Sequence, residues 1–179
     1  MTGRWRMTGA GVLIAVALLL AGAKEQGTGE GQPPAPSGPQ EAEVVGVVLD
    51  RQTQQPMVVL QGKRDKRHLV IAIGFFEANG IAIPLQGVTP PRPLTYDLLL
   101  TLLGNLKTSL KRVIITDLRD DIYYATLFLD AQGRELSVDS RPSDAIALAL
   151  RARVPILIED RVFDKADRLV PKPGPSPHF

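Results

Sequence analysis

The segment IYYATLFLDAQGRELSVDSRPSDAIALAL, residues 122–150, decides the fold, because it holds two strands and a helix in one continuous run. Residues 122–130 and 134–139 are short runs of strand-forming residues, and the turn residues AQG separate them. Apolar side chains at helical spacing follow from Ala145. The segment therefore predicts an antiparallel hairpin that leads directly into a helix.

The chain contains two copies of this unit. A further strand pattern at residues 112–118 precedes the hairpin, so the second half reads as three strands and a helix. The first half has the same layout, with strands predicted at residues 43–50, 57–62 and 67–73 and a helix that begins at Phe75. Stacking two such units would let each bury the apolar face of the other. The sequence predicts an α+β domain of mostly antiparallel strands, built from duplicated β-β-β-α units.

Two further helices and a strand complete the expected fold. Residues 91–112 join the halves as an amphipathic helix with Thr95 as N-cap and with leucines at helical spacing, namely Leu98, Leu99, Leu102, Leu103, Leu106 and Leu110. Pro84 is expected to end or bend the helix of the first half. Residues 154–160 predict a last short strand, and residues 161–170 a closing helix.

The N-terminal segment, residues 1–23, has the layout of an export signal. Arg4 and Arg6 precede an apolar run at residues 12–20, and AGA supplies a small-residue cleavage site before Lys24. The alternative is an uncleaved anchor, but the apolar run is shorter than the roughly 20 residues that span a bilayer. We therefore predict cleavage, a periplasmic or secreted location, and no membrane span in the mature chain.

The composition divides the rest of the chain into a flexible linker at residues 24–42, a folded domain at 43–170 and a disordered tail at 171–179. Loss of Arg4 and Arg6 with the signal reduces the 21 lysines and arginines to 19, which equals the 19 acidic residues. Bulk charge thus gives no support for tight nucleic-acid binding, which would need a local basic patch. The absence of cysteine excludes disulfides, thiolate metal sites and a cysteine nucleophile.

The polar cluster SRPSD at residues 140–144 has two interpretations. In the first interpretation the cluster only starts a helix: Arg141 is the N-cap and Pro142 takes the first helical position. Asp144 takes the third helical position, where its carboxylate faces the positive end of the helix dipole. In the second interpretation the cluster is a chemical site: the free amides of the same helix terminus would bind a phosphate, and Arg141 would hydrogen-bond to the phosphate oxygens. The duplication places Glu77 near the counterpart of this cluster in the first half.

Other polar residues are open to the same two interpretations. Asp120 and Asp121 fit a turn between two strands, but turn chemistry explains the neighbouring Asp117 and Arg119 less well. Glu77 and Asp97 are either first-turn carboxylates or metal ligands. The basic run KRDKRH at residues 63–68 is either a solvated turn or a contact for a phosphate backbone.

Known catalytic signatures are scarce. His68 and His178 are the only histidines, and the sequence contains no Walker A loop, G-x-G-x-x-G or H-E-x-x-H motif. Any reaction would rest on carboxylates and arginines, with or without a divalent cation such as Mg²⁺.

Four blocks in order resemble the bifunctional nuclease domain family: GFFEANGIAIPLQGV, PRPLTYDLL, DLRDDIYYATL and VDSRPSDAIALALRARVPILIED. The resemblance covers about residues 44–162. It implies a compact α+β domain, a homodimer, and cleavage of both RNA and DNA. One position departs from the family pattern, because Tyr96 stands where histidine is usual. A tyrosine with an ordinary pKa of about 10 cannot replace histidine as a base at neutral pH.

These observations lead to a nuclease hypothesis with assigned roles. The expected catalytic residues are Asp117, Arg119, Arg141 and Asp144; the expected substrate-binding residues are Ser143, Arg92, Lys63 and Arg67; the expected metal ligands are Glu77 and Asp97. In this hypothesis the carboxylates position a Mg²⁺-type ion and water, and the arginines stabilise charge on the phosphoryl oxygens. The alternative is a non-catalytic binding or assembly module of the cell envelope, favoured by the neutral mature charge and the missing histidine.

Overall fold

The computed structural model describes residues 38–169. The predicted signal peptide, the tail at residues 171–179 and most of the predicted linker lie outside these residues. The first strand begins at Gln40, inside the segment whose composition predicted a linker. Within residues 38–169, no helix has both the length and the apolar character needed to cross a membrane.

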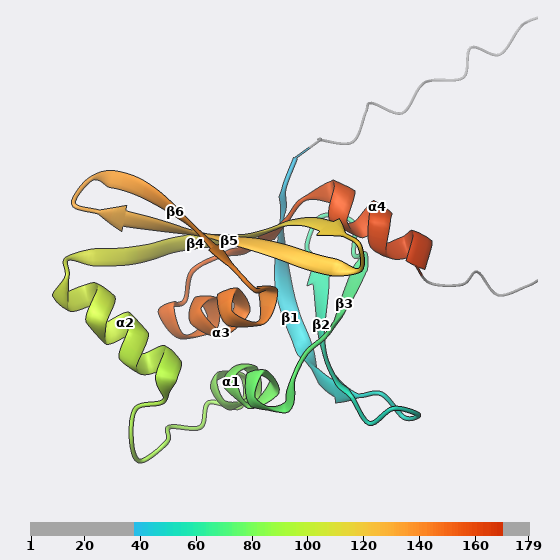
Figure 1. Cartoon of the computed structure of the whole chain (residues 1–179), viewed down its shortest axis with the longest axis horizontal. Helices are drawn as coiled ribbons and strands as arrows, with labels where there is room; N and C mark the ends of the chain where they lie inside the picture. Colours follow the sequence, from blue (N-terminus) through green and yellow to red (C-terminus); the bar gives the residue numbers. More distant parts are fainter. Residues whose placement is uncertain (1–37, 170–179) are drawn as a thin grey trace, which may run out of the picture. The chain divides into compact units, whose positions relative to one another are not determined.

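The described residues form one seven-stranded sheet and four helices, which confirms the predicted α+β class (Figure 1). Each half contributes a three-strand meander and then a helix, as the duplication predicts. The strands are β1 Gln40–Leu49, β2 Pro56–Gly62, β3 His68–Ala72, β4 Thr108–Arg119, β5 Ile122–Ala131, β6 Arg134–Ser140 and β7 Ile156–Ile158. The helices are α1 Phe75–Leu85, α2 Thr95–Asn105, α3 Pro142–Ala152 and α4 Asp160–Leu169.

The two meanders meet edge to edge through β7, which corrects the prediction that the two units stack on each other's apolar faces. The strand order is β3-β2-β1-β7-β4-β5-β6, so β7 separates the halves. It pairs antiparallel with β1, where Gln40 faces Ile158, and parallel with β4, where Val113 faces Ile156. A strand that bonds both halves gives them a shared sheet, and the helices α1 and α3 then pack against each other (Figure 1).

Helix α3 lies at the centre of the core. All five side chains from Ala145 to Ala149 are at most 2% exposed, and three of them are alanines that permit close approach of the sheet. The helix packs on β4 and β5 and against α1 and α2. Its N-terminus, where Arg141 lies, is therefore held in a fixed position.

Helix α2 departs from the prediction at both ends. Its N-cap is Leu94, so Thr95 is the first helical residue and Asp97 the third; the Asp97 carboxylate accepts a hydrogen bond of 2.9 Å from the Leu94 amide. This bond satisfies a free helix-end amide and so fixes the earlier start. Leu110 belongs to β4, because Lys107 takes a left-handed backbone conformation (φ 54°) beyond the helix. Helix α1 ends at Leu85, directly after Pro84, as predicted.

Candidate functional site

The site is built where two equivalent helix N-termini meet. Helix α1 follows the third strand of the first meander, and α3 follows the third strand of the second. Arg141 is the N-cap of α3 and Pro142 its first residue, as predicted, although no side chain caps the helix by a hydrogen bond. Glu77 is the third residue of α1, and Asp144 is the third residue of α3. The packing of α1 on α3 brings these two carboxylates to the same arginine.

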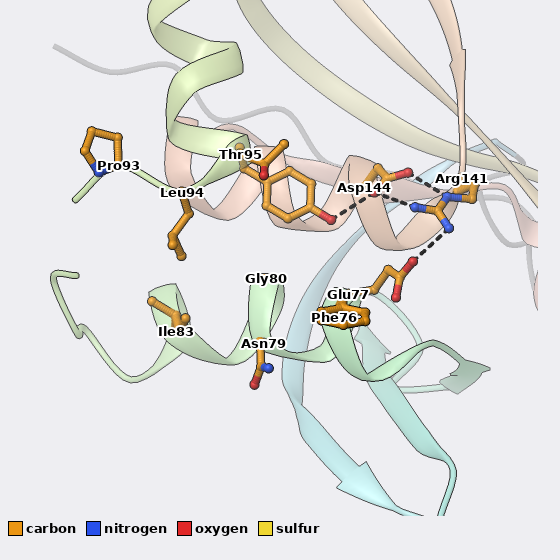
Figure 2. A pocket seen from close by; sticks show the side chains of 11 residues that line it. Phe76, Glu77, Asn79, Gly80, Ile83, Pro93, Leu94, Thr95, Arg141 and Asp144 are labelled. Atoms are coloured by element: carbon orange, nitrogen blue, oxygen red, sulfur yellow. Dashed lines mark hydrogen bonds and ion pairs between the residues drawn. The ribbon is translucent and has the colours of Figure 1, made fainter. Parts of the chain in front are cut away.

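Arg141 bridges the two carboxylates (Figure 2). Its Nε donates to Asp144 Oδ2 at 2.8 Å, its Nη2 donates to Asp144 Oδ1 at 3.1 Å, and its Nη1 donates to Glu77 Oε1 at 2.8 Å. The hydrogen bonds with Asp144, and then with Glu77, raise the pKa of Arg141 above its ordinary value. The Arg141 side chain is nevertheless 65% exposed, whereas those of Glu77 and Asp144 are 19% and 28% exposed. The bridge thus orients a charged group that solvent still reaches.

Tyr96 of α2 completes this network, because its hydroxyl donates to Asp144 Oδ1 at 2.9 Å. Burial, followed by the hydrogen bond with Asp144, raises the pKa of Tyr96 to about 12. The phenol is therefore protonated at neutral pH and acts as a hydrogen-bond donor. Gly80 of α1 makes room for the ring, since a Cβ at this position would collide with Tyr96 Cε2.

These residues border a cavity with a volume of about 900 Å³. Its walls come from α1, from residues 93–96 and from the first turn of α3. Glu77 and Arg141 also line a second cavity of about 340 Å³, together with Ser143 and Tyr123. The larger volume lies in the range of small-molecule and cofactor sites.

Arg151 is a residue of this region that the sequence interpretation missed. Its side chain is 7% exposed, and its Nε donates to Asp97 Oδ1 at 3.0 Å. Its Nη1 donates to the carbonyl oxygens of Gly80 and Ala147, and its guanidinium lies 5.1 Å from the Tyr96 ring centroid. Arg151 thus joins α1, α2 and α3. A signal was available, because Arg151 follows Asp144 by seven residues and so shares its face of α3.

Asp117 and Arg119, two of the predicted catalytic residues, lie apart from Arg141. Asp117 accepts a 2.6 Å hydrogen bond from Lys165 of α4, and its other carboxylate oxygen is 3.3 Å from Arg119 Nε. The bond from Lys165 lowers the pKa of Asp117. Arg119 lies over the Tyr124 ring at 4.0 Å. Neither residue lines the two cavities that Arg141 borders.

The predicted substrate-binding residues fall in three places. Ser143 is buried, 7% exposed, and lines the second cavity. Arg92 lines a third cavity of about 340 Å³ with Asp97 and Arg151. Lys63 and Arg67 lie elsewhere: Lys63 pairs with Glu41 on β1, and Arg67 pairs with Asp65, Asp160 and Asp164.

The basic turn at residues 63–68 therefore has a structural role. Arg64 also pairs with Asp160, and the Arg67 guanidinium lies 4.6 Å from the Phe163 ring centroid. These contacts hold the β2–β3 turn against α4.

The predicted metal ligands Glu77 and Asp97 do not form one donor set. Glu77 accepts from Arg141, whereas Asp97 accepts from Arg151 and from the Leu94 amide. The carboxylate that does lie beside Glu77 is Asp144, and the Arg141 cation lies between the two. Among residues 38–169, no three histidine, aspartate or glutamate side chains gather as a metal site. The donor set around Arg141 does not fit a divalent cation.

Comparison with known proteins gives consistent results. The profile of the bifunctional nuclease domain matches residues 58–170. An uncharacterised protein of Mycobacterium tuberculosis (strain ATCC 25618 / H37Rv) is 44% identical over 131 residues, which cover 73% of this chain and 78% of the relative. Bifunctional nuclease 1 of Oryza sativa subsp. japonica is 31% identical over 120 residues, 64% of this chain and 36% of the relative. Bifunctional nuclease 1 of Arabidopsis thaliana is 29% identical over 108 residues, 58% of this chain and 33% of the relative. With the profile covering most of the folded domain, and with the Arg141 site inside it, the chain belongs to the bifunctional nuclease domain family.

Proposed function

We propose that the protein hydrolyses phosphodiester bonds in RNA or DNA at the cavity beside Arg141. The observation that carries this proposal is an exposed guanidinium, fixed by Glu77 and Asp144, at the edge of a cavity of about 900 Å³. The plant relatives, which are named bifunctional nucleases, support the same activity.

Arg141 is the group that binds the phosphoryl oxygens. A guanidinium carries five N–H donors, and three of them are used in the bonds with Glu77 and Asp144. The remaining donors are available to an anion because the side chain is 65% exposed. Since the two carboxylates already hold the side chain in place, little reorganisation is needed when negative charge develops on the phosphoryl oxygens.

Glu77 and Tyr96 have complementary proton roles in this proposal. Both oxygens of Asp144 accept hydrogen bonds, whereas Glu77 Oε2 has no hydrogen-bond partner among the described residues. Glu77 accepts a proton from the attacking water while the water oxygen forms a bond to phosphorus. Tyr96, whose pKa of about 12 keeps it protonated, turns its hydroxyl from Asp144 to the leaving alcohol oxygen and donates its proton as the P–O ester bond breaks. Solvent then returns both groups to their starting states.

A cleavage assay tests this function directly. The purified wild type and the variants Arg141→Ala and Asp144→Asn are each incubated with single-stranded RNA and with single-stranded DNA. Each incubation is done once in the presence of Mg²⁺ and once in the presence of EDTA. Both variants are expected to lose cleavage. Arg112→Ala is the matched control, because Arg112 makes an exposed ion pair with Glu135 and does not line the cavity. An inert wild type, or an Asp144→Asn variant as active as wild type, contradicts the mechanism. Equal cleavage with Mg²⁺ and with EDTA is expected, because the residues around Arg141 do not fit a divalent cation.

We also propose export, on the basis of residues 1–23, and a homodimer. The leucines of α2 and its C-cap support the dimer, because Leu98, Leu99 and Leu102 of the helix and the C-cap Leu106 are 54%, 39%, 50% and 70% exposed. Apolar side chains gathered on one helix mark an interaction surface. The same surface favours the assembly-module alternative. Sedimentation of Leu102→Glu tests the dimer, since a charge in the interface should release monomers, and an unchanged sedimentation coefficient would exclude this surface.

A further inference from the structure

Phe76 is exposed to an extent that core packing does not explain. It is 89% exposed, the highest value among the exposed large apolar side chains of the described residues. It is the second residue of α1 and lines the cavity of about 900 Å³. Its neighbour Phe75 is 63% exposed and does not line this cavity. An aromatic ring held at the edge of a cavity is available to a ligand.

The cavity carries two kinds of surface within a short distance. Phe76 and Arg141 line the same cavity, and the carboxylate of Glu77, the residue after Phe76, contacts Arg141 (Figure 2). Ile83 of α1 and the segment 93–94 supply further apolar lining. A nucleotide has matching parts, because its phosphate is anionic and its base is a flat ring with an apolar face.

We infer that Phe76 is a stacking platform for an unpaired nucleobase of a single-stranded nucleic acid whose phosphate binds Arg141. This inference rests on the proposed function and names its substrate class. In a duplex, neighbouring bases cover both faces of each base, so a duplex would have to unstack before a base reached the ring. The structure thus favours single strands over duplexes. The adjacent cation favours an anionic polymer over a second protein chain as the occupant.

The binding test uses short phosphorothioate-linked oligonucleotides, which resist cleavage, and fluorescence anisotropy at fixed salt. The probes are a single strand, the same strand with abasic sites, and its duplex. Phe76→Ala is expected to weaken binding of the base-bearing single strand about tenfold, the loss of one base–aromatic stack. Binding of the abasic strand should not change. Phe76→Trp should retain the affinity, and Phe75→Ala is the matched control, with wild-type affinity for every probe.

The outcomes separate this inference from the proposed function. If wild type does not cleave but Phe76→Ala weakens binding of the base-bearing strand and not of the abasic strand, the hydrolytic function is wrong and the stacking platform stands. If wild type cleaves and Phe76→Ala binds every probe as wild type does, the stacking platform is wrong and the hydrolytic function stands.

A sedimentation change in Phe76→Ala without a change in oligonucleotide binding would assign the ring to a protein interface, and so overturn the inference. Thermal melts should show that this exposed ring contributes little to stability.

Discussion

Glu77 and Asp144 occupy the same position, the third residue, in the first turns of α1 and α3, and both accept hydrogen bonds from Arg141. The duplication of the chain thus produces two equivalent carboxylates. The equivalence is broken at the preceding N-cap, which is Gly74 in α1 and Arg141 in α3. One arginine therefore serves both halves, and it is the residue on which the proposed chemistry depends.

Replacing Arg141 should reduce activity far more than stability. Arg141→Ala is expected to lower the cleavage rate by about 100-fold or more, because a preorganised donor to the phosphoryl oxygens is lost. The unfolding free energy should fall by only about 1 kcal/mol, since solvent screens an ion pair at a side chain that is 65% exposed. Arg141→Lys, which keeps the charge but not the forked geometry, should recover little of the rate. Cleavage assays and urea denaturation check both values, and a large stability loss with unchanged cleavage would make Arg141 a purely structural cap.

Tyr96 should make the fold sensitive to alkaline pH. The pKa of Tyr96 is about 12 in the folded protein and about 10 in the unfolded chain. The unfolded state therefore loses this proton first, and the stabilisation, fully present below about pH 10, is lost as the pH rises to about 12. Thermal melts across this window should show a steeper fall in Tm for wild type than for Tyr96→Phe. Parallel curves for the two proteins would show that the Tyr96 hydroxyl is not linked to folding.

Two helical glycines should respond oppositely to alanine. Gly80→Ala introduces a Cβ into the Tyr96 ring, so either the ring or α1 must move, at a cost of about 1–3 kcal/mol. Gly104, in α2, has no atom within 4 Å of the added Cβ. Gly104→Ala should therefore stabilise the helix by about 0.5–1 kcal/mol. Urea denaturation measures both, and equal effects would contradict the close packing of Tyr96 on α1.

Arg151 should contribute to stability through a nearly buried ion pair. Arg151→Met keeps much of the side-chain volume but leaves Asp97 without its cation, and a loss of about 2–3 kcal/mol is expected because Asp97 is partly exposed. Adding Asp97→Asn should restore part of this loss, since no unpaired carboxylate remains. Denaturation of the two single variants and the double variant gives the coupling energy. Strict additivity would show that the pair does not hold the three helices together.

The sequence predicts the elements of this fold well because their signals are local. A few neighbouring residues are enough to predict the strands around Val58 and Leu127, the turn at Gly133 and the start of α3 at Pro142. The end of α2 is not readable in this way. The leucine spacing continues to Leu110, but Lys107 takes a left-handed conformation that apolar periodicity does not reveal.

The site could be predicted only in part, for a similar reason. Asp144, Arg141 and the counterpart position of Glu77 follow from helix-start signals and from the repeat, and the structure brings them together. Asp117 of β4 contacts Lys165 of α4 instead, a residue 48 positions later in the sequence. No local signal reports such a long-range contact, and resemblance to a family identifies motif positions without their geometry.

The three-residue strand β7 makes the joining of the two meanders into one sheet a late step in the folding of the nascent chain. It is the last strand within residues 38–169 and the one that bonds both β1 and β4. Until the ribosome has produced residues 156–158, the two meanders have complete hydrogen-bonding within themselves but open edges toward each other. Such edges are templates for pairing with other chains. A nascent chain stalled or truncated before Ile156 should therefore be far more prone to aggregate than the finished domain.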